Sequence, residues 1–76
     1  MRNDYYIFIA NVLQVIESEA REDLFSARKI LNRELENYEC APSVRSKLEK
    51  LARKAERKTS YRSMINLLKE IVGEDE

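Results

Sequence analysis

The residue types that could do chemistry are concentrated in one basic stretch, SVRSKLEKLARKAERKTSYR, at positions 43–62. It holds eight Lys or Arg and two Glu, and a helix of 3.6 residues per turn would place its apolar residues on one side and most of its cations on the other. The cations expected on the exposed side are Lys47, Lys50, Arg53, Lys54, Arg57 and Lys58. An array of this kind could bind nucleic-acid phosphates, an acidic protein or an acidic membrane surface.

The formal net charge of zero hides a strong polarity along the chain. Residues 1–40 carry five positive and eight negative side chains, residues 43–62 have a net charge of +6, and the last three residues are all acidic. The alternative to a binding surface is therefore a basic helix that is solvated, or that lies against the acidic N-terminal half. Tyr61 is the one aromatic residue of the stretch, which argues against the stacking of unpaired bases and leaves groove or backbone binding open.

The remaining reactive residue types do not form a catalytic constellation. The chain has no His and one Cys, Cys40, so it lacks the side chain that most often acts as a base near neutral pH, and a tetrahedral zinc site lacks its ligands. Carboxylates cluster at 19–23 and 34–39, without the His residues that accompany Glu in the iron sites of helix bundles. We expect no catalytic residue, no metal or cofactor site and no small-molecule substrate.

An apolar run, YYIFIANVLQVI, occupies residues 5–16. Ten of its twelve residues are apolar, and a helix that is apolar almost all round is normally buried almost all round. Because a chain of 76 residues offers little cover, we expect this helix to meet a second subunit in a homodimer. The alternative is that a four-helix form of the chain covers the run itself. The residues expected at the dimer interface are Tyr5, Tyr6, Phe8, Ile9, Val12, Val15 and Ile16.

The same run could also be interpreted as a targeting or membrane segment. Twelve residues are too few to span a bilayer, which takes about 20. Asp4 precedes the run and Asn11 and Gln14 interrupt it, which counts against a secretory signal. Since a lone cysteine suits a reducing compartment, we expect a cytoplasmic protein without a transmembrane segment.

These residues must be positioned by helices, because the chain has one Gly, one Pro and 37% charged residues. Apolar residues recur at steps of three and four through the first half of the chain, which predicts one long helix over about 4–39. A turn within ESEARED, near residues 18–22, is the alternative and would give four short antiparallel helices. The residues of this apolar stripe are Ile9, Leu13, Ile16, Ala20, Leu24, Ala27, Leu31, Leu35 and Tyr38.

Two shorter helices are expected to follow. Pro42 disfavours helix in the residue before it and ends the first helical region. Ser43 is then expected to cap a helix over about 43–58, and Thr59 or Ser60 to cap another over about 60–72. The sequence therefore predicts an all-α single domain over residues 1–76, either a helical hairpin or a small antiparallel helix bundle.

The segment LARKAERKTS, residues 51–60, resembles the end of the central helix and the second loop of archaeal histones. The resemblance implies a long central helix and contacts to DNA phosphates from Arg57, Lys58 and Thr59. It covers ten residues, and the chain departs from the family at Pro42 and at Met64, where the family carries an aspartate.

Residues 24–71 are similar in layout to pediocin-type bacteriocin immunity proteins. The segments LNRELENYECAPSVRSKLEKL and INLLKEI resemble the helix–Pro turn–helix segment and the last helix of that family. The resemblance implies a cytoplasmic four-helix bundle that blocks a membrane-active peptide or its receptor.

Taken together, these features predict a non-catalytic binding or regulatory protein. It would self-associate through its apolar N-terminal helix and engage an acidic macromolecular partner through the basic stretch. Direct binding to the backbone of DNA or RNA is the first alternative, and an immunity-like four-helix bundle is the second.

Overall fold

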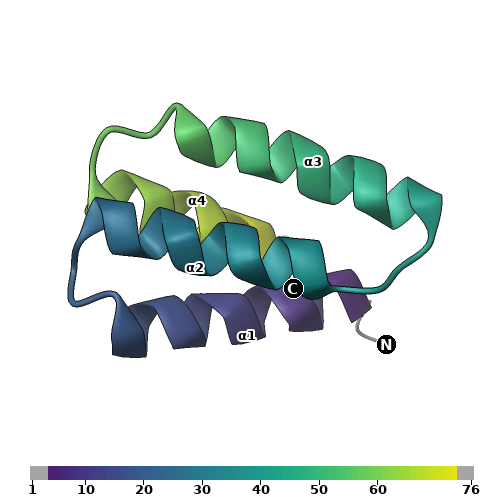
Figure 1. Ribbon diagram of the computed structural model, residues 1–76, viewed down its shortest axis with the longest axis horizontal. Coiled ribbons are helices and arrows are strands. Elements are labelled where there is room, and N and C mark those ends of the chain that lie inside the picture. Colours follow the sequence, from purple (N-terminus) through teal and green to yellow (C-terminus); the bar gives the residue numbers. More distant parts are fainter. Residues whose placement is uncertain (1–3, 74–76) are drawn as a thin grey trace.

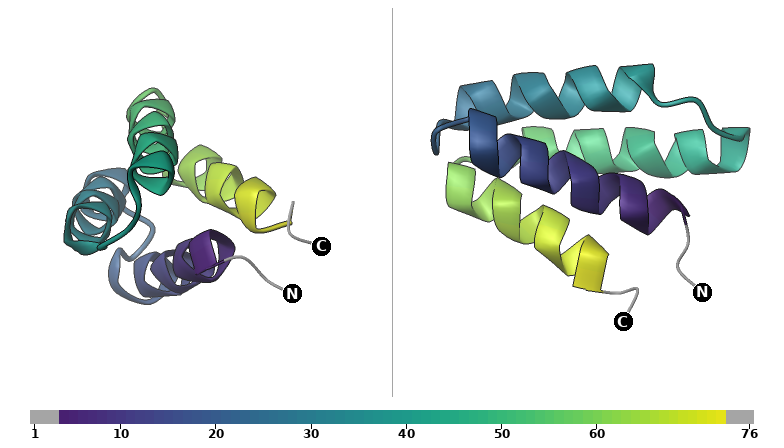
Figure 2. Two further views of the ribbon diagram at one scale, coloured as in Figure 1. Left: turned by 90° about the vertical axis from the view of Figure 1, so that its right-hand side faces the viewer. Right: turned by 90° about the horizontal axis from the view of Figure 1, so that it is seen from below.

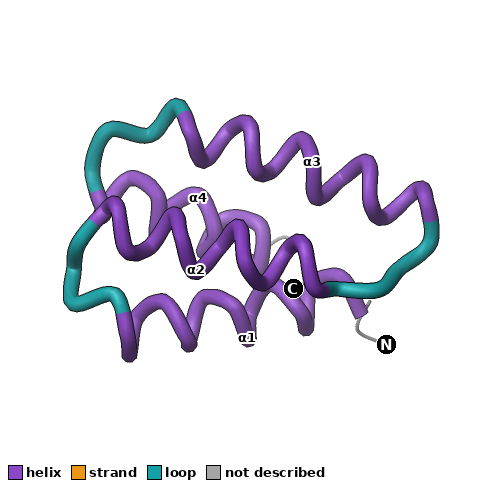
Figure 3. Tube along the Cα trace, viewed as in Figure 1, coloured by secondary structure: helices purple, strands orange, loops and turns teal. Residues whose placement is uncertain are grey.

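The computed structural model describes residues 4–73 and places four helices in them. These are α1 (Asp4–Glu19), α2 (Leu24–Asn37), α3 (Pro42–Glu56) and α4 (Tyr61–Gly73). Consecutive helices run in opposite directions, so the starts of α1 and α3 and the end of α4 lie at the same end of the molecule (Figures 1 and 3). The predicted all-α antiparallel bundle is confirmed. The acidic residues 74–76 lie outside the described residues.

The long helix expected over 4–39 is wrong, and the turn near 18–22 is confirmed. Arg21 and Glu22 have φ angles of 50° and 59°, in the left-handed region that interrupts a right-handed helix. Asp23 then caps α2, which begins at Leu24, because the Asp23 carboxylate accepts a hydrogen bond of 2.8 Å from the Ser26 N–H. A side-chain cap of this kind satisfies one of the free N–H groups of the first turn.

The spacing of apolar residues did not predict this turn, because the apolar stripe continues through it without a gap. Ile16, Ala20 and Ala27 are all 2% exposed or less, so the turn itself buries a residue that continues the stripe. The chain reverses direction here while its apolar side keeps facing the same core.

The starts of the two later helices follow different rules. α3 starts at Pro42, preceded by Ala41 with no side-chain cap. Pro suits the first helical position because its missing N–H would have no intrahelical partner there. The Ser43 cap is therefore wrong by two residues, since Ala41 holds the N-cap position. The Ser60 cap is confirmed, since its Oγ accepts a hydrogen bond of 3.1 Å from the Ser63 N–H.

The core lies between all four helices, which surround it when the molecule is viewed end-on (Figure 2). No polar or charged residue of the described part of the chain is buried in it. Its residues are Tyr5, Ile9, Val12, Leu13, Ile16, Ala20, Ala27, Ile30, Leu31, Leu35, Leu48, Leu51, Ala55, Met64, Ile65 and Leu68.

The chain thus covers most of its own N-terminal helix. Ile9 and Ile16 are fully buried, Val12 is 1% exposed and Tyr5 is 8% exposed in a single copy. The expectation that a second subunit must cover these four residues is wrong, because α4 packs against α1 more extensively than any other helix and α2 adds a second wall. Burial of the run therefore no longer argues for a dimer.

The architecture bears on both resemblances. The longest helix is α1, with 16 residues, so the long central helix implied by the histone resemblance is wrong. Four antiparallel helices agree with the architecture implied by the immunity-protein resemblance. No helix among residues 4–73 is long and apolar enough to cross a membrane.

Candidate polyanion-binding site

We call six cations the basic face of α3: Lys47, Lys50, Arg53, Lys54, Arg57 and Lys58. The helix expected over about 43–58 ends at Glu56, so Arg57 and Lys58 directly follow it and the other four lie on it. Five of these side chains are exposed and the sixth, Lys58, is half-buried. The opposite side of α3 buries Leu48, Leu51 and Ala55. The predicted split between an apolar and a cationic side of this helix is confirmed.

The cations of the basic face form no ion pair with the rest of the described chain. Within residues 4–73 the structure contains one ion pair, between Arg33 Nε and Glu34 at 3.5 Å, and both partners belong to α2. α3 does lie against the first half of the chain, because α2 is its main neighbour, but no ion pair joins the two helices within the described residues. An unpaired array of like charges repels itself, and a bound polyanion would relieve that repulsion.

One cation of the basic stretch has a structural task instead. Arg45 uses Nη1 to donate to the Leu35 carbonyl at 2.6 Å and Nη2 to donate to the Tyr38 carbonyl, at the end of α2. Its guanidinium thereby binds carbonyls that have no intrahelical partner, near the negative end of the helix dipole. Arg45 is therefore committed to the fold.

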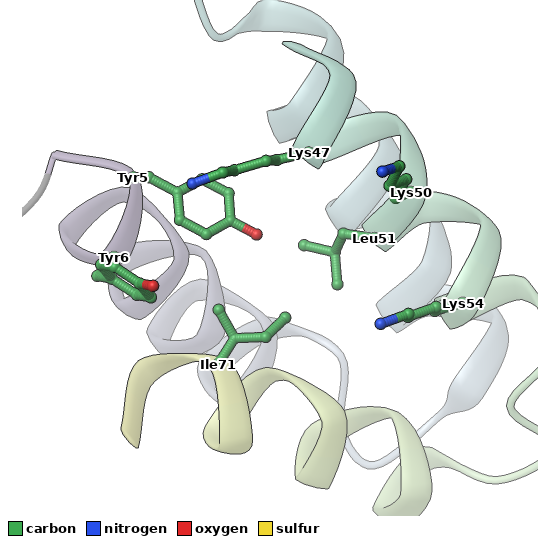
Figure 4. Close-up of a pocket in the computed structure, with 7 residues that line it drawn as sticks. All are labelled: Tyr5, Tyr6, Lys47, Lys50, Leu51, Lys54 and Ile71. Carbon is green, nitrogen blue, oxygen red and sulfur yellow. The ribbon is translucent and has the colours of Figure 1, made fainter. Parts of the chain in front are cut away.

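A pocket opens beside the basic face, at the end of the bundle where α1 and α3 begin (Figure 4). It has a volume of about 250 Å³. It forms because α3 packs mainly against α2 and touches α1 and α4 less extensively. We call it the lysine–tyrosine pocket. It is lined by Tyr5, Tyr6, Lys47, Lys50, Leu51, Lys54 and Ile71.

The pocket brings together aromatic and cationic groups from opposite halves of the chain. Lys47 Nζ lies 5.3 Å from the centroid of the Tyr5 ring, within the range of a cation–π contact. The Tyr5 and Tyr6 rings meet edge to face, with centroids 5.3 Å apart and an interplanar angle of 77°. Tyr5 is buried, whereas Tyr6 is half-exposed.

The expectation that the basic face lacks aromatic residues beyond Tyr61 is therefore wrong. Tyr5 and Tyr6 lie about forty residues before the lysines in the sequence, so a search within the basic stretch does not find them. The four-helix alternative would have predicted that these tyrosines lie near the lysines. In an up-and-down bundle the first and third helices begin at the same end, which places residues 5–6 near residue 47.

The other residues expected at a dimer interface are half-buried in the single chain. Phe8 stacks on Tyr38 with ring centroids 3.8 Å apart and planes 13° from parallel. Val15 packs against the core from its edge. The exposed large apolar side chains of the described chain are Ile7 and Phe25, on different helices.

The described residues hold no group of three or more His, Cys, Asp or Glu that could bind a metal ion. Cys40 is half-buried and free. Burial, followed by the charges of Glu17 and Glu22, raises the pKa of the Tyr61 hydroxyl above its ordinary value of 10.0.

No family model, no curated protein and no solved structure matches this chain.

Proposed function

We propose that this chain is a non-catalytic binding protein that engages an acidic macromolecule through the basic face of α3. The observation that carries the proposal is the absence of any ion pair between the six cations of that face and the carboxylates of residues 4–73. Folding buries the apolar side of α3 and forms no ion pair with the six cations of the basic face.

The physical reason is the release of counterions. A polyanion holds condensed cations, and each Lys or Arg that replaces one of them releases it into solution. Binding then weakens as salt is added, with a slope set by the number of contacts. Four cations along a helix of 15 residues, and two directly after it, can make several such contacts without the cost of ordering a long loop.

We propose a cytoplasmic location, because a lone cysteine suits a reducing compartment. A homodimer is not part of the proposal, because the apolar residues that suggested it are covered within one chain. The basic face is exposed in a single copy and needs no second subunit to be complete.

The test is fluorescence anisotropy with three labelled polyanions: duplex DNA, single-stranded DNA and polyglutamate. We expect at least one to bind with an affinity that falls steeply with salt. The double substitution Arg53→Glu/Arg57→Glu should weaken binding on the order of tenfold or more. The matched control is Arg62→Glu/Lys69→Glu, which makes the same change in net charge at exposed positions of α4.

Equal losses in the two double variants would show that net charge, rather than this face, determines binding. Failure of the unmodified chain to bind any of the three polyanions at low salt would overturn the proposal.

A further inference from the structure

The residues that line the lysine–tyrosine pocket indicate which kind of acidic macromolecule the basic face binds, if the proposed function holds. Its three lysines come from positions 47, 50 and 54 of α3. At 3.6 residues per turn they fall within a sector of about 60° on the helix surface, so they approach the pocket from one side (Figure 4). None of the lining residues carries a negative charge.

The other lining groups are aromatic and aliphatic. Leu51 and Ile71 provide an apolar wall. The half-exposed ring of Tyr6, on α1, lies across the pocket from α3, which carries the lysines (Figure 4). A polyglutamate chain has a carboxylate for each lysine but no group to fill an aromatic and aliphatic recess. A nucleotide has both a phosphate for the ammonium groups and a flat base for a tyrosine ring.

The size of the pocket favours part of a polymer over a complete small ligand. Its volume of about 250 Å³ lies just below the range of about 300–1,000 Å³ typical of small-molecule sites. A ligand held here by one phosphate and one ring would continue outside the pocket. Arg53 and Arg57 extend the same charged side of α3 and are exposed, so they are placed to contact the neighbouring phosphates of a strand.

A base must be unpaired to enter such a recess. The bases of a duplex are stacked and paired, and their faces are inaccessible to a side chain at the surface. We therefore propose that the chain binds single-stranded nucleic acid, with one unpaired nucleotide in the lysine–tyrosine pocket, its phosphate among Lys47, Lys50 and Lys54 and its base against the Tyr6 ring.

The test compares a labelled oligothymidine strand, a duplex of the same length and polyglutamate by fluorescence anisotropy. Tyr6→Ala should weaken single-strand binding by at least about fivefold, which is the lower end of base–aromatic stacking. Tyr6→Phe keeps the ring and should keep the affinity. Phe25→Ala is the matched control, because it removes an aromatic ring that is 65% exposed on α2, outside the pocket.

Polyglutamate separates a lost base contact from a folding defect. Tyr6→Ala should leave its affinity unchanged, because polyglutamate offers no base, whereas a folding defect would weaken binding of every polyanion. The salt slope gives an independent readout, since Lys54→Ala should reduce its magnitude for the single strand by about 0.7. Lys29→Ala, on α2, should not change the slope.

Three outcomes would overturn the nucleotide proposal: no effect of Tyr6→Ala, the same loss with Phe25→Ala, or an equal loss for polyglutamate. If Arg53→Glu/Arg57→Glu still weakens binding in those cases, the proposed function of the basic face stands. If the unmodified chain binds no polyanion at all, both proposals fail together.

Discussion

Two arginines join α2 and α3 at opposite ends of the pair. Arg45 of α3 donates to carbonyls at the end of α2. Arg28 of α2 donates to the Glu56 carbonyl at 3.1 Å and to the Lys58 carbonyl at 2.5 Å, at the end of α3. Each guanidinium therefore satisfies carbonyls that a helix end leaves unpaired, and each is attracted to the negative end of the helix dipole.

We expect Arg45→Ala to lower the free energy of unfolding by about 1.5–3 kcal/mol, the range for hydrogen bonds that involve a charged group. Arg45→Lys should recover part of this loss, because an ammonium group keeps the charge but lacks the fork that reaches two carbonyls. Urea denaturation measures both changes. Arg53→Ala is the control at an exposed position of the same helix and should change stability by no more than about 0.5 kcal/mol. Equal effects at positions 45 and 53 would contradict the structural role of Arg45.

Asp23 gives the fold a dependence on acid. Hydrogen bonds with the Ser26 side chain and then with its backbone N–H lower the pKa of the Asp23 carboxyl below its ordinary value of 3.8. A depressed folded-state pKa contributes stability that is fully present above the unfolded value. The contribution is lost as the pH falls from the unfolded value through the folded value.

The variant Asp23→Asn isolates this effect, because an amide oxygen still caps the helix but does not titrate. We expect the stability of the unmodified chain relative to Asp23→Asn to decline as the pH is lowered below about 3.8. Denaturant titrations over a descending series of pH values measure the difference. Parallel pH profiles for the two proteins would show that the Asp23 carboxylate is not linked to folding.

At the residue scale the sequence predicts the exposed cations well and the pocket poorly. Helical spacing alone puts Lys50 and Arg53 on the solvent side, because charged side chains cannot be buried without partners. The contribution of Tyr6 depends on which helix ends meet, and a search within one segment contains no information about that. The role of Arg45 was also missed, since its partners belong to the preceding helix.

Among the elements, the turn between α1 and α2 holds two residues in the left-handed backbone region, which residues other than glycine disfavour. Arg21 and Glu22 both have positive φ, which costs a residue other than glycine about 1–2 kcal/mol. Glycine adopts this region freely but loses about 0.5–1 kcal/mol more backbone entropy on folding. The net of the two favours glycine at such a position.

We expect Arg21→Gly to raise the free energy of unfolding by up to about 1 kcal/mol. Arg21→Val should lower it, because a β-branched side chain is strongly disfavoured at positive φ. The control is Gln14→Gly at an exposed position inside α1, where glycine should destabilise by about 1 kcal/mol. Thermal unfolding of the three variants measures the pattern, and destabilisation by glycine at both positions would count against the left-handed turn.

At this turn, the spacing of apolar residues predicts burial correctly but does not predict where one helix ends and the next begins. The apolar stripe predicts which residues are buried, and Leu13, Ala20 and Leu31 are all in the core. It does not reveal where the helix reverses, because Ala20 continues the stripe through the turn. The acidic cap at Asp23 was the local signal, and it lies within a charged segment that reads equally well as a solvated helix face.

At the scale of the whole molecule, a chain of 76 residues covers most of its apolar N-terminal helix with its own helices. Four helices of 13 to 16 residues give α1 two closely packed neighbours, which one long helix and two short ones would not provide. The buried positions Ile9 and Ile16 face that interior. Among the apolar residues of α1, Ile7 is 41% exposed and Tyr6 is half-exposed.

The contrast between Ile9 and Ile7 tests whether the core belongs to one chain. We expect Ile9→Ala to lower the free energy of unfolding by about 2–5 kcal/mol, because it leaves a cavity in the monomer core. Ile7→Ala should change it by no more than about 0.5 kcal/mol, as at other surface positions. Both values follow from chemical denaturation.

Protein concentration decides between a core within one chain and an interface between two. If a single chain covers α1, the unfolding midpoint of the unmodified protein is the same at every concentration, and the mass in solution is 9.0 kDa. An interface that helped to bury Ile9 would instead raise the midpoint as the protein is concentrated, because association stabilises the folded state by mass action. Such a rise, abolished by Ile9→Ala and accompanied by a doubled mass in light scattering, would restore the dimer and overturn the single-chain core.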